Sequence, residues 1–359
     1  MEKSDVLIVG GGVAGLTVAK FLAEEGVDYI LLEEHDDFFK KACGEGVTPV
    51  LGDYTFFDLY ESKKGIENVA EGSIISTKYG VMEYPLPNII CDKREMEAEL
   101  ARQATKKGGE IRMNTRCEDI AENVAFPQEI KFKICVGADG IHSFIRKKLG
   151  IKNPDIGVGM CGITKDIDKE RNKCYIEFKK EVIPYGYSWY FPKKDEWNIG
   201  IGTTRVKYFK EYSQKFKEMH SNEIKWNGSF LPVSKPLKPY NGNFALVGDA
   251  ASHVIALLGD GILPSMICAK ILADVIIKFA RNDYRNIDFS VYEERLKKEI
   301  YKHFLEGYRA YQVLSSIWFS EYLFHVFLKM MNRMAKKTNQ CGCRFWHGFK
   351  YLTCSKSFI

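Results

Sequence analysis

Residues 5–15 read Asp-Val-Leu-Ile-Val-Gly-Gly-Gly-Val-Ala-Gly, and this stretch is the strongest indication of the fold class. An apolar run typical of a buried parallel strand comes first, and glycines in the spacing Gly-x-Gly-x-x-Gly then stand directly before a helical pattern over residues 16–25. Gly10 permits a tight turn, Gly12 lets a pyrophosphate touch the backbone, and Gly15 lets the helix pack on the strand. The positive end of that helix favours bound phosphates. The stretch therefore predicts a dinucleotide-binding βαβ unit.

A second apolar strand strengthens this prediction. It covers residues 29–32 and ends at Glu33, eighteen residues past Gly15, where a carboxylate accepts hydrogen bonds from a ribose diol. A glycine turn in an unrelated parallel α/β fold is the alternative, and it leaves Glu33 unexplained. The cofactor contacts that we expect from this unit are Gly10, Gly12, Val13, Ala14, Gly15, Glu33 and Glu34.

Two later stretches indicate which dinucleotide binds. Residues 134–150 end a strand on an Asp-Gly pair and then start a helix, and residues 244–262 end another strand on a Gly-Asp pair before a further helix. In this order they resemble the motifs of the flavoprotein hydroxylase-like superfamily. The resemblance implies that the cofactor is FAD, that Asp249 holds ribityl hydroxyls, and that the helix beginning near Gly261 points its N-terminus at the flavin. The further contacts that it implies are Asp139, Gly140, Gly248, Asp249, Gly259, Gly261 and Ile262.

A further glycine pattern does not predict a nucleotide site. Residues 157–162 also fit Gly-x-Gly-x-x-Gly, yet no strand precedes them, and charged residues follow in place of a helix. The surrounding region, 151–239, has the pattern of a sheet, because residues 173–178 and 197–202 alternate apolar and polar side chains between turn-forming clusters.

An aromatic strand lies within this sheet region. Residues 184–192 read Pro-Tyr-Gly-Tyr-Ser-Trp-Tyr-Phe-Pro, and Tyr187, Trp189 and Phe191 alternate, so they should face one side. Core packing explains such residues, and so does a wall beside an apolar substrate. Together with the Gly-Ile-Gly at 200–202, the motif resembles the geranylgeranyl reductase family, flavoproteins that saturate isolated double bonds of prenyl chains.

Members of that family carry a Cys-Gly pair between the second strand and the next helix, and the stretch Cys43-Gly44-Glu45-Gly46 matches this position. The resemblance implies that the loop crosses the reactive face of the flavin, where Gly44 and Gly46 let the backbone approach the ring. Three interpretations of Cys43 stay open: a proton donor, a packing or gating element beside the flavin, or an ordinary core cysteine. As a proton donor it is at a disadvantage, because a thiol of pKa about 8.5 is a weak acid. The substrate-side candidates are Cys43, Gly44, Tyr187 and Trp189, and we expect Cys43 and Gly44 to bind the cofactor as well.

The resemblance implies an α/β fold, α+β overall, with a Rossmann-like FAD-binding domain, an inserted antiparallel β-sheet domain for the substrate, and a C-terminal helical region. The expected boundaries are 1–70, 90–150 and 240–285 for the first, 71–89 and 151–239 for the second, and 286–359 for the third. The implied activity is FAD-dependent reduction of geranylgeranyl or polyprenyl chains in archaeal-type membrane lipid biosynthesis, with electrons from ferredoxin, a deazaflavin or NAD(P)H. A flavin monooxygenase of the same fold and an electron-transfer flavoprotein that reduces a quinone are the alternatives.

The C-terminal third shows a helical pattern over residues 317–329, with Glu321, His325 and Lys329 four apart on one narrow face. This helix either covers the protein's own substrate tunnel or lies in a membrane interface. Basic side chains at its end favour contact with anionic lipid: Lys329, Arg333, Lys336 and Lys337. We expect no metal site, because no common metal-site spacing is matched by Cys341, Cys343, His347 and Cys354.

Composition and charge narrow the class of protein. The 359 residues are 45% hydrophobic and 28% charged, which are ordinary values for a folded enzyme. The net charge of +5 is spread along the chain, without the basic clusters that nucleic-acid binding favours. The 10 cysteines lack paired spacing, and no apolar run is long enough to span a bilayer. We therefore expect a cytoplasmic protein, peripheral on the cytoplasmic membrane face, with no nucleic-acid partner.

Overall fold

The computed structural model describes residues 1–85, 87–106, 108–221 and 223–341. The chain forms two compact units, here called unit 1 and unit 2. Unit 1 consists of Met1–Lys40, Arg94–Asp155 and Ser234–Leu305, and unit 2 of Lys41–Lys93, Ile156–Val233 and Glu306–Ile359. The expected boundaries place residues 1–70 in the cofactor-binding domain, whereas residues 41–70 of the structure belong to unit 2.

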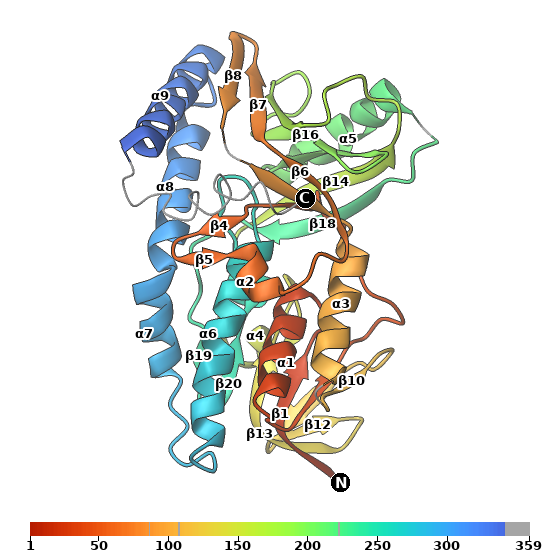
Figure 1. Cartoon of the computed structure of the whole chain (residues 1–359), viewed down its shortest axis with the longest axis vertical. Helices are drawn as coiled ribbons and strands as arrows, with labels where there is room; N and C mark the ends of the chain where they lie inside the picture. Colours follow the sequence, from red (N-terminus) through yellow and green to blue (C-terminus); the bar gives the residue numbers. More distant parts are fainter. Residues whose placement is uncertain (86, 107, 222, 342–359) are drawn as a thin grey trace. The chain divides into compact units, whose positions relative to one another are not determined.

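Unit 1 contains an eight-stranded sheet whose central strands are parallel (Figure 1). The strand order is β10-β2-β1-β13-β12-β11, and β20, which pairs with β19, joins the sheet beside β13. Val6, Leu7 and Ile8 of β1 are fully buried, as in a parallel strand covered on both faces. The strands are β1 (Glu2–Val9), β2 (Tyr29–Leu32), β10 (Glu110–Arg112), β11 (Asp119–Ala121), β12 (Val124–Phe126), β13 (Ile130–Gly137), β19 (Tyr240–Asn241) and β20 (Phe244–Leu246).

Helices α1 and α6 pack against each other in unit 1. α1 begins at Val13, three residues before the predicted start, because Gly12 has extended torsions and serves as the N-cap. α6 is buried along most of its length, which agrees with its nearly continuous apolar sequence. The helices are α1 (Val13–Glu24), α3 (Lys93–Lys106), α4 (Phe144–Lys148), the 3₁₀ helix η1 (Gly248–Ala251), α6 (Ile262–Ala280) and α7 (Ser290–Glu299), and α8 (Tyr301–Ile317) runs from unit 1 into unit 2.

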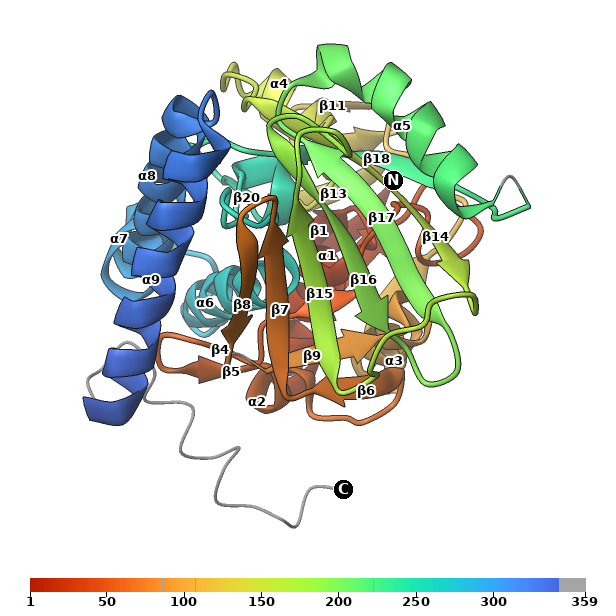
Figure 2. The ribbon, with the colours of Figure 1, turned by 90° about the horizontal axis from the view of Figure 1, so that it is seen from above.

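Unit 2 contains a seven-stranded, largely antiparallel sheet in the order β18-β14-β17-β16-β15-β7-β8 (Figure 2). Residues 157–162 lie inside β14, so their glycines are part of a strand and not of a turn between a strand and a helix. Together the two sheets confirm the predicted fold class. The strands are β7 (Gly72–Thr77), β8 (Gly80–Tyr84), β14 (Ile156–Thr164), β15 (Lys173–Phe178), β16 (Gly186–Pro192), β17 (Trp197–Thr203) and β18 (Asn227–Pro232).

Helix α5 contacts β14 and β17 on one face of this sheet (Figure 2). Its Phe216 shares a hydrophobic cluster with Tyr190 of β16 and Ile199 of β17. Because side chains alternate along a strand, the residues on either side of Tyr190 point to the opposite face. The other elements of unit 2 are β3 (Gly46–Val47), β4 (Val50–Leu51), β5 (Tyr54–Thr55), β6 (Ile66–Ala70), β9 (Asn88–Cys91), α2 (Phe56–Tyr60), α5 (Val206–His220) and α9 (Glu321–Cys341).

The C-terminal helical region corrects one expectation. The sequence pattern predicts a single helix over residues 317–329, but α8 ends at Ile317 and α9 begins at Glu321. Ser320 lies in the turn between them, where its hydroxyl accepts a hydrogen bond of 3.3 Å from the Leu323 N–H and so caps α9. Every helix within the described ranges is too short or too polar to cross a membrane.

Candidate functional site

The glycine turn after β1 leaves open space only at Gly12. A Cβ on Gly10 would lie 2.4 Å from the carbonyl oxygen of Ala138, and a Cβ on Gly15 would lie 2.0 Å from the carbonyl oxygen of Gly10. Gly10 also has a φ of +106°, which L side chains rarely adopt. By contrast, a Cβ on Gly12 would meet nothing closer than Glu97 Oε1, at 3.9 Å. Gly10 and Gly15 therefore shape the turn, and Gly12 presents open backbone where α1 begins.

Glu33 closes one side of this turn. Its Oε2 accepts a hydrogen bond of 2.7 Å from the Gly11 N–H, and its Oε1 accepts one of 3.0 Å from the His35 N–H. Glu34 is exposed instead, and its carboxylate lies 3.7 Å from Arg116 Nε. Of the two predicted acids, the structure thus places Glu33 at the turn and Glu34 away from it.

Asp139 follows β13 and stabilises the start of α4. Its Oδ2 accepts a hydrogen bond of 3.0 Å from the Ile145 N–H, while its Oδ1 has no hydrogen-bond partner among the residues that the structure describes. Burial raises the pKa of this carboxyl. Gly140 follows with a φ of +73°, which turns the chain away from the strand. A buried, half-satisfied carboxyl is an arrangement that a polar group of a ligand would complete.

Arg146 is a buried side chain that the predicted site left out. It is 1% exposed, and it joins the loop after β13 to η1. Its guanidinium donates hydrogen bonds to the carbonyl oxygens of Ile141 and Ala250 and to Asn153 Oδ1, at 2.7, 3.2 and 2.9 Å. The Asp-Gly and Gly-Asp loops of unit 1 are therefore fixed to each other by one residue.

The Gly-Asp loop lies against the start of α1. Gly248 opens η1 with a φ of +68°, and a Cβ there would lie 2.8 Å from the Cβ of Ala14. Asp249 follows within η1. Gly261 is the N-cap of α6, and neither Gly261 nor Gly12 supplies a side-chain cap to its helix. Two helix N-termini of unit 1 therefore lack the side-chain acceptor that usually satisfies their first N–H groups.

These features of unit 1 fit FAD. The open backbone at Gly12 suits a pyrophosphate, and Glu33 suits a ribose diol. The start of α6 suits the polar edge of a flavin, since a helix N-terminus favours partial negative charge. Val13, Ala14, Gly259 and Ile262 belong to the same turns and helix starts.

In unit 2, the Cys43–Gly46 loop packs against β16. A Cβ on Gly44 would lie 3.2 Å from Trp189 Nε1, and a Cβ on Gly46 would lie 2.8 Å from Phe191 Cε2. The two glycines therefore let the loop approach an aromatic strand, a contact that the sequence pattern did not predict.

The aromatic side chains of β16 form a continuous face. Ring centroids lie 6.0 Å apart for Tyr187 and Trp189, and 6.4 Å apart for Trp189 and Phe191. All three point away from the α5 side of the sheet, which confirms their predicted alternation. The Trp189 indole N–H donates a hydrogen bond of 3.0 Å to Asn198 Oδ1, so its ring orientation is fixed.

Glu45 is the centre of a buried polar cluster that sequence reasoning missed. Its Oε2 accepts hydrogen bonds of 2.8 Å from Lys193 Nζ and 3.0 Å from Asn198 Nδ2, and its Oε1 accepts one of 2.9 Å from the Lys93 N–H. The backbone of Glu45 has a φ of +60°, an unusual value for a residue with a side chain. These bonds hold the loop in that conformation.

Cys43 is held by the same cluster. Its carbonyl oxygen accepts a hydrogen bond of 2.9 Å from Asn198 Nδ2, and its Sγ accepts one of 3.3 Å from the Glu45 N–H. Burial raises the pKa of the Cys43 thiol above its usual value. The sulfur therefore keeps its proton at neutral pH and is not a thiolate nucleophile.

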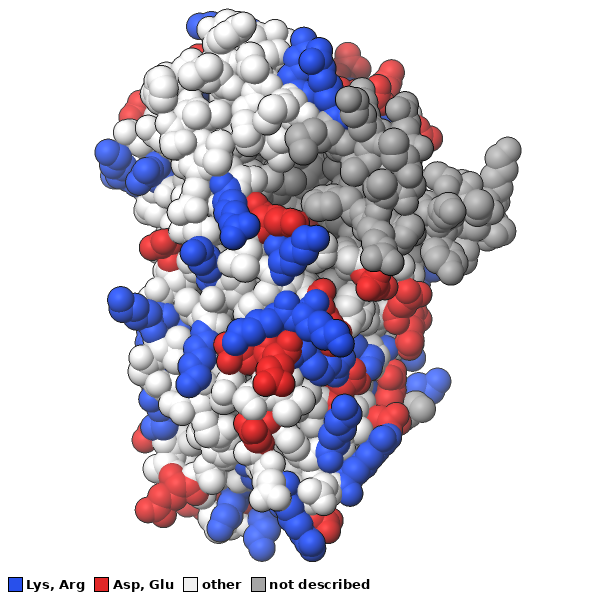
Figure 3. All heavy atoms as spheres, turned by 90° about the vertical axis from the view of Figure 1, so that its left-hand side faces the viewer, with Lys and Arg blue, Asp and Glu red and all other residues white. Residues whose placement is uncertain are grey.

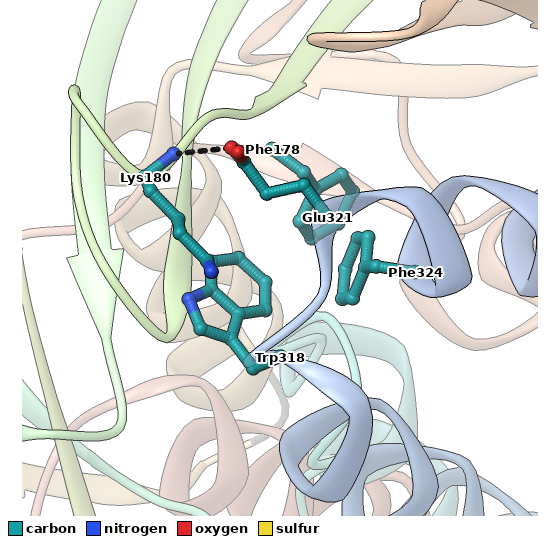
Figure 4. Close-up of a pocket in the computed structure, with 5 residues that line it drawn as sticks. All are labelled: Phe178, Lys180, Trp318, Glu321 and Phe324. Carbon is teal, nitrogen blue, oxygen red and sulfur yellow. Dashed lines mark hydrogen bonds between the residues drawn. The ribbon is translucent and has the colours of Figure 1, made fainter.

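The aromatic face of β16 continues toward the turn between α8 and α9. Phe178 lies 5.5 Å from Tyr187 and 5.1 Å from Phe324 between ring centroids. Figure 4 shows a small hollow at this corner, where Trp318 and Phe324 face Phe178, and the Lys180 N–H donates to the Glu321 carboxylate. The hollow of about 10 Å³ holds no more than one water.

No group of three or more metal-ligating side chains occurs within the described part of the chain. Of the four residues weighed as metal ligands, Cys343, His347 and Cys354 lie outside the described residues.

Unit 1 thus defines a dinucleotide-binding protein of the flavoprotein class. A family model described as an FAD binding domain matches residues 3–266, so the chain belongs to this family and its cofactor is FAD. The protein is accordingly an FAD-dependent oxidoreductase.

Two relatives show which flavoproteins the chain resembles. A digeranylgeranylglycerophospholipid reductase of Methanocaldococcus jannaschii is 25% identical, with 87% of both chains covered. The protein of that name from Methanosarcina acetivorans is 29% identical, with 75% of this chain and 74% of the relative covered. These relatives confirm the resemblance to geranylgeranyl reductases.

Solved structures show the same fold. A geranylgeranyl bacteriochlorophyll reductase-like protein from Thermoplasma acidophilum has a TM-score of 0.76 at 22% identity, and 87% of both chains is covered. A flavin-dependent brominase has a TM-score of 0.67 at 16% identity, with 96% of this chain and 94% of that chain covered. The fold therefore serves more than one flavin chemistry.

Proposed function

We propose that the protein saturates isolated C=C bonds in geranylgeranyl or other polyprenyl chains of archaeal-type membrane lipids. Its family membership supports a flavin oxidoreductase, and its relatives named as reductases support the substrate class. The observation that carries the proposal is the aromatic face of β16, which an ordered, hydrogen-bonded loop holds in place at Cys43 and Gly44. An apolar prenyl chain is the kind of ligand that such a face binds.

Reduced FAD, when bound, supplies the hydride for this reaction. An isolated alkene has no carbonyl group that hydrogen-bond donors could polarise, so the protein acts by alignment and by exclusion of water. Tyr187, Trp189 and Phe191 provide an apolar wall for both purposes. Glu45 and Lys193 form a buried ion pair at the loop, so each of these two charges has an opposite charge beside it.

The raised pKa of Cys43 bears on its three possible roles. Burial makes this thiol an even weaker acid than a free thiol, whose pKa is about 8.5. Protonation of an unactivated alkene requires a strong acid. We therefore favour the packing or gating role for Cys43 over the role of proton donor.

An anaerobic experiment tests the proposal. The purified protein is reduced with dithionite, and a geranylgeranyl glycerophospholipid is added while flavin absorbance and product mass are followed. Reoxidation of the flavin with mass gains in steps of two hydrogens is the expected result. A flavin that stays reduced until oxygen or a quinone is admitted would overturn the proposal.

A flavin monooxygenase is the second candidate, because the fold also occurs in a probable FAD-dependent monooxygenase from Pseudomonas aeruginosa. It predicts that prenyl lipid stimulates oxygen consumption and that the product gains one oxygen atom. The electron-transfer alternative predicts that a quinone reoxidises the flavin without any prenyl lipid. Ferredoxin, a deazaflavin and NAD(P)H are the electron donors that we propose to compare, each by its rate of flavin reduction under argon.

A further inference from the structure

The α9 region exposes a stripe of large apolar side chains. Phe319 is 73% exposed, and the positions that follow at helical spacing are exposed as well. We call these residues the α9 stripe: Phe319, Tyr322, Leu323, Val326 and Met330. Isolated apolar residues are common on protein surfaces, but a contiguous stripe of this kind marks a contact with another apolar body.

The opposite side of α9 is hydrogen-bonded to β7 and β8 of the same unit, and these bonds keep the α9 stripe exposed. The Tyr84 hydroxyl donates a hydrogen bond of 2.6 Å to the Leu328 carbonyl oxygen, and Asn332 Nδ2 donates one of 3.2 Å to the Glu83 carbonyl oxygen. The ring nitrogen of His325 lies 2.8 Å from the Thr77 hydroxyl. These bonds hold His325, Leu328 and Asn332 of α9 against β7 and β8.

The tip of the β7–β8 hairpin extends the stripe. Tyr79 and Val81 are exposed there, and the ring of Tyr79 lies 5.6 Å from that of Tyr322 in an edge-to-face arrangement. Tyrosines of this kind suit a membrane interface, because the ring is apolar and the hydroxyl is polar. Two elements far apart in the sequence thus build one apolar surface.

The charges near this surface are mainly positive. Lys78, Lys329 and Arg333 are exposed around it. Of two nearby acids, Glu83 is paired with a base, since Lys173 Nζ lies 2.7 Å from its Oε1, and Glu321 accepts a hydrogen bond from the backbone N–H of Lys180. Figure 3, which views the side of the molecule that carries α9, shows an upper area largely without charged side chains, with both basic and acidic side chains at its edges.

From this geometry we infer that the α9 stripe and the β7–β8 tip insert into the interface of a bilayer that contains anionic lipid. α9 is too polar to span a membrane, and therefore it lies in the interface plane. The positive rim suits acidic headgroups. A second copy of the chain is disfavoured, because a symmetric contact through this surface would bring the two positive rims together. The inference concerns binding alone and does not require the proposed reductase activity.

Vesicle co-sedimentation of the FAD-loaded protein tests the inference. Vesicles of phosphatidylcholine alone are compared with vesicles that also contain phosphatidylglycerol. The double variant Phe319→Ser/Leu323→Ser should weaken binding to both kinds of vesicle about tenfold or more, because two large apolar side chains no longer move from water into the lipid. The double variant Lys329→Gln/Arg333→Gln should weaken binding to the anionic vesicles alone, by roughly fivefold for each charge.

Met219→Ser is the matched control, because Met219 is 63% exposed on α5, away from the stripe. It should bind vesicles as the parent protein does. Circular dichroism should show all variants folded, since the substituted side chains are exposed. Parent-like binding of the Phe319/Leu323 variant would overturn the inference. So would a parent protein that is dimeric in solution and becomes monomeric in that variant, which would assign the surface to a second copy.

Discussion

Lys193→Met should destabilise the protein, because it leaves the carboxylate of Glu45 buried without its counter-charge. Lys193 Nζ lies 2.8 Å from Glu45 Oε2, and the two side chains are 9% and 2% exposed. Removal of one partner of such a pair costs about 3–5 kcal/mol of unfolding free energy. Asn198 Nδ2 and the Lys93 N–H still donate to the carboxylate, so we expect the lower end, about 3 kcal/mol.

A double-mutant cycle isolates the interaction between the two charges. Glu45→Gln removes the negative charge, and the double variant Glu45→Gln/Lys193→Met removes both. The double variant should be more stable than the sum of the single effects predicts, by about 2 kcal/mol. Urea denaturation of the FAD-loaded protein, followed by circular dichroism, gives the free energies. A coupling energy below about 0.5 kcal/mol would refute the reasoning.

A surface ion pair of the same sheet provides the control. Lys173 Nζ lies 2.7 Å from Glu83 Oε1, but their side chains are 17% and 55% exposed. Lys173→Met should therefore cost less than about 1 kcal/mol. An equal loss of unfolding free energy in Lys193→Met and Lys173→Met would show that burial does not strengthen the contribution of the Glu45 pair to stability.

The buried pair also predicts a pH dependence. Burial alone would lower the pKa of Lys193, but attraction to Glu45 and the hydrogen bond between them outweigh burial, and the net pKa is raised. The folded pKa thus exceeds the unfolded value of about 10.4. The stabilisation is complete below that pH and is lost as the pH rises through the folded pKa. The parent and Lys193→Met should therefore converge in stability in alkaline solution.

Cys43→Ala should preserve the flavin content but change the rate at which prenyl lipid reoxidises the reduced flavin. If the thiol acts by packing, Cys43→Ser should not restore the parent rate. Identical rates in the parent and both variants would exclude any role of Cys43 in this reaction. Gly46→Ala should lower the unfolding free energy by about 1–3 kcal/mol, because its Cβ would lie 2.8 Å from Phe191 Cε2, and an unchanged urea midpoint would contradict this contact. Burial lowers the pKa of His253 to about 3, so the stability that its neutral ring allows should be lost as the pH falls below about 6.5. His253→Phe should reduce this loss in acid denaturation curves, and curves parallel to those of the parent would contradict the assignment.

The cofactor turn could be predicted because its chemistry is local. β1, the glycine turn, α1 and β2 follow one another, and each position requires a particular residue type. Gly10 has a positive φ, Gly15 sits too close to its neighbours for a side chain, and Glu33 ends β2 beside the turn. Residues that are close in the sequence here are therefore also close in space, so their spacing in the sequence predicts the turn. Glu34 shows the limit of that rule, since the pattern does not say which of two adjacent acids faces the turn.

The Glu45 cluster could not be predicted in this way. Lys193 and Asn198 are 148 and 153 residues away from Glu45 in the sequence. Their meeting depends on the pairing of β16 with β17 and on a loop that packs across β16, and neither is encoded in a local spacing. One feature of the sequence did point to this cluster, because Lys193 directly follows the aromatic strand. A charged residue that is buried beside apolar side chains needs a partner of opposite charge.

The polar residues of α9 show why periodicity alone did not tell which face of that helix is exposed. On an ordinary surface helix, the polar face turns to water. Here Glu321 and His325 contact Lys180 and Thr77. Phe324 and Leu328 are buried, whereas the apolar side chains of the α9 stripe are left exposed. This arrangement is unfavourable in water, since it exposes apolar surface, and it becomes favourable where that surface meets hydrocarbon. Phe319→Ser should therefore make the protein more soluble at the same time as it weakens vesicle binding, two effects that a purely structural role for Phe319 does not link.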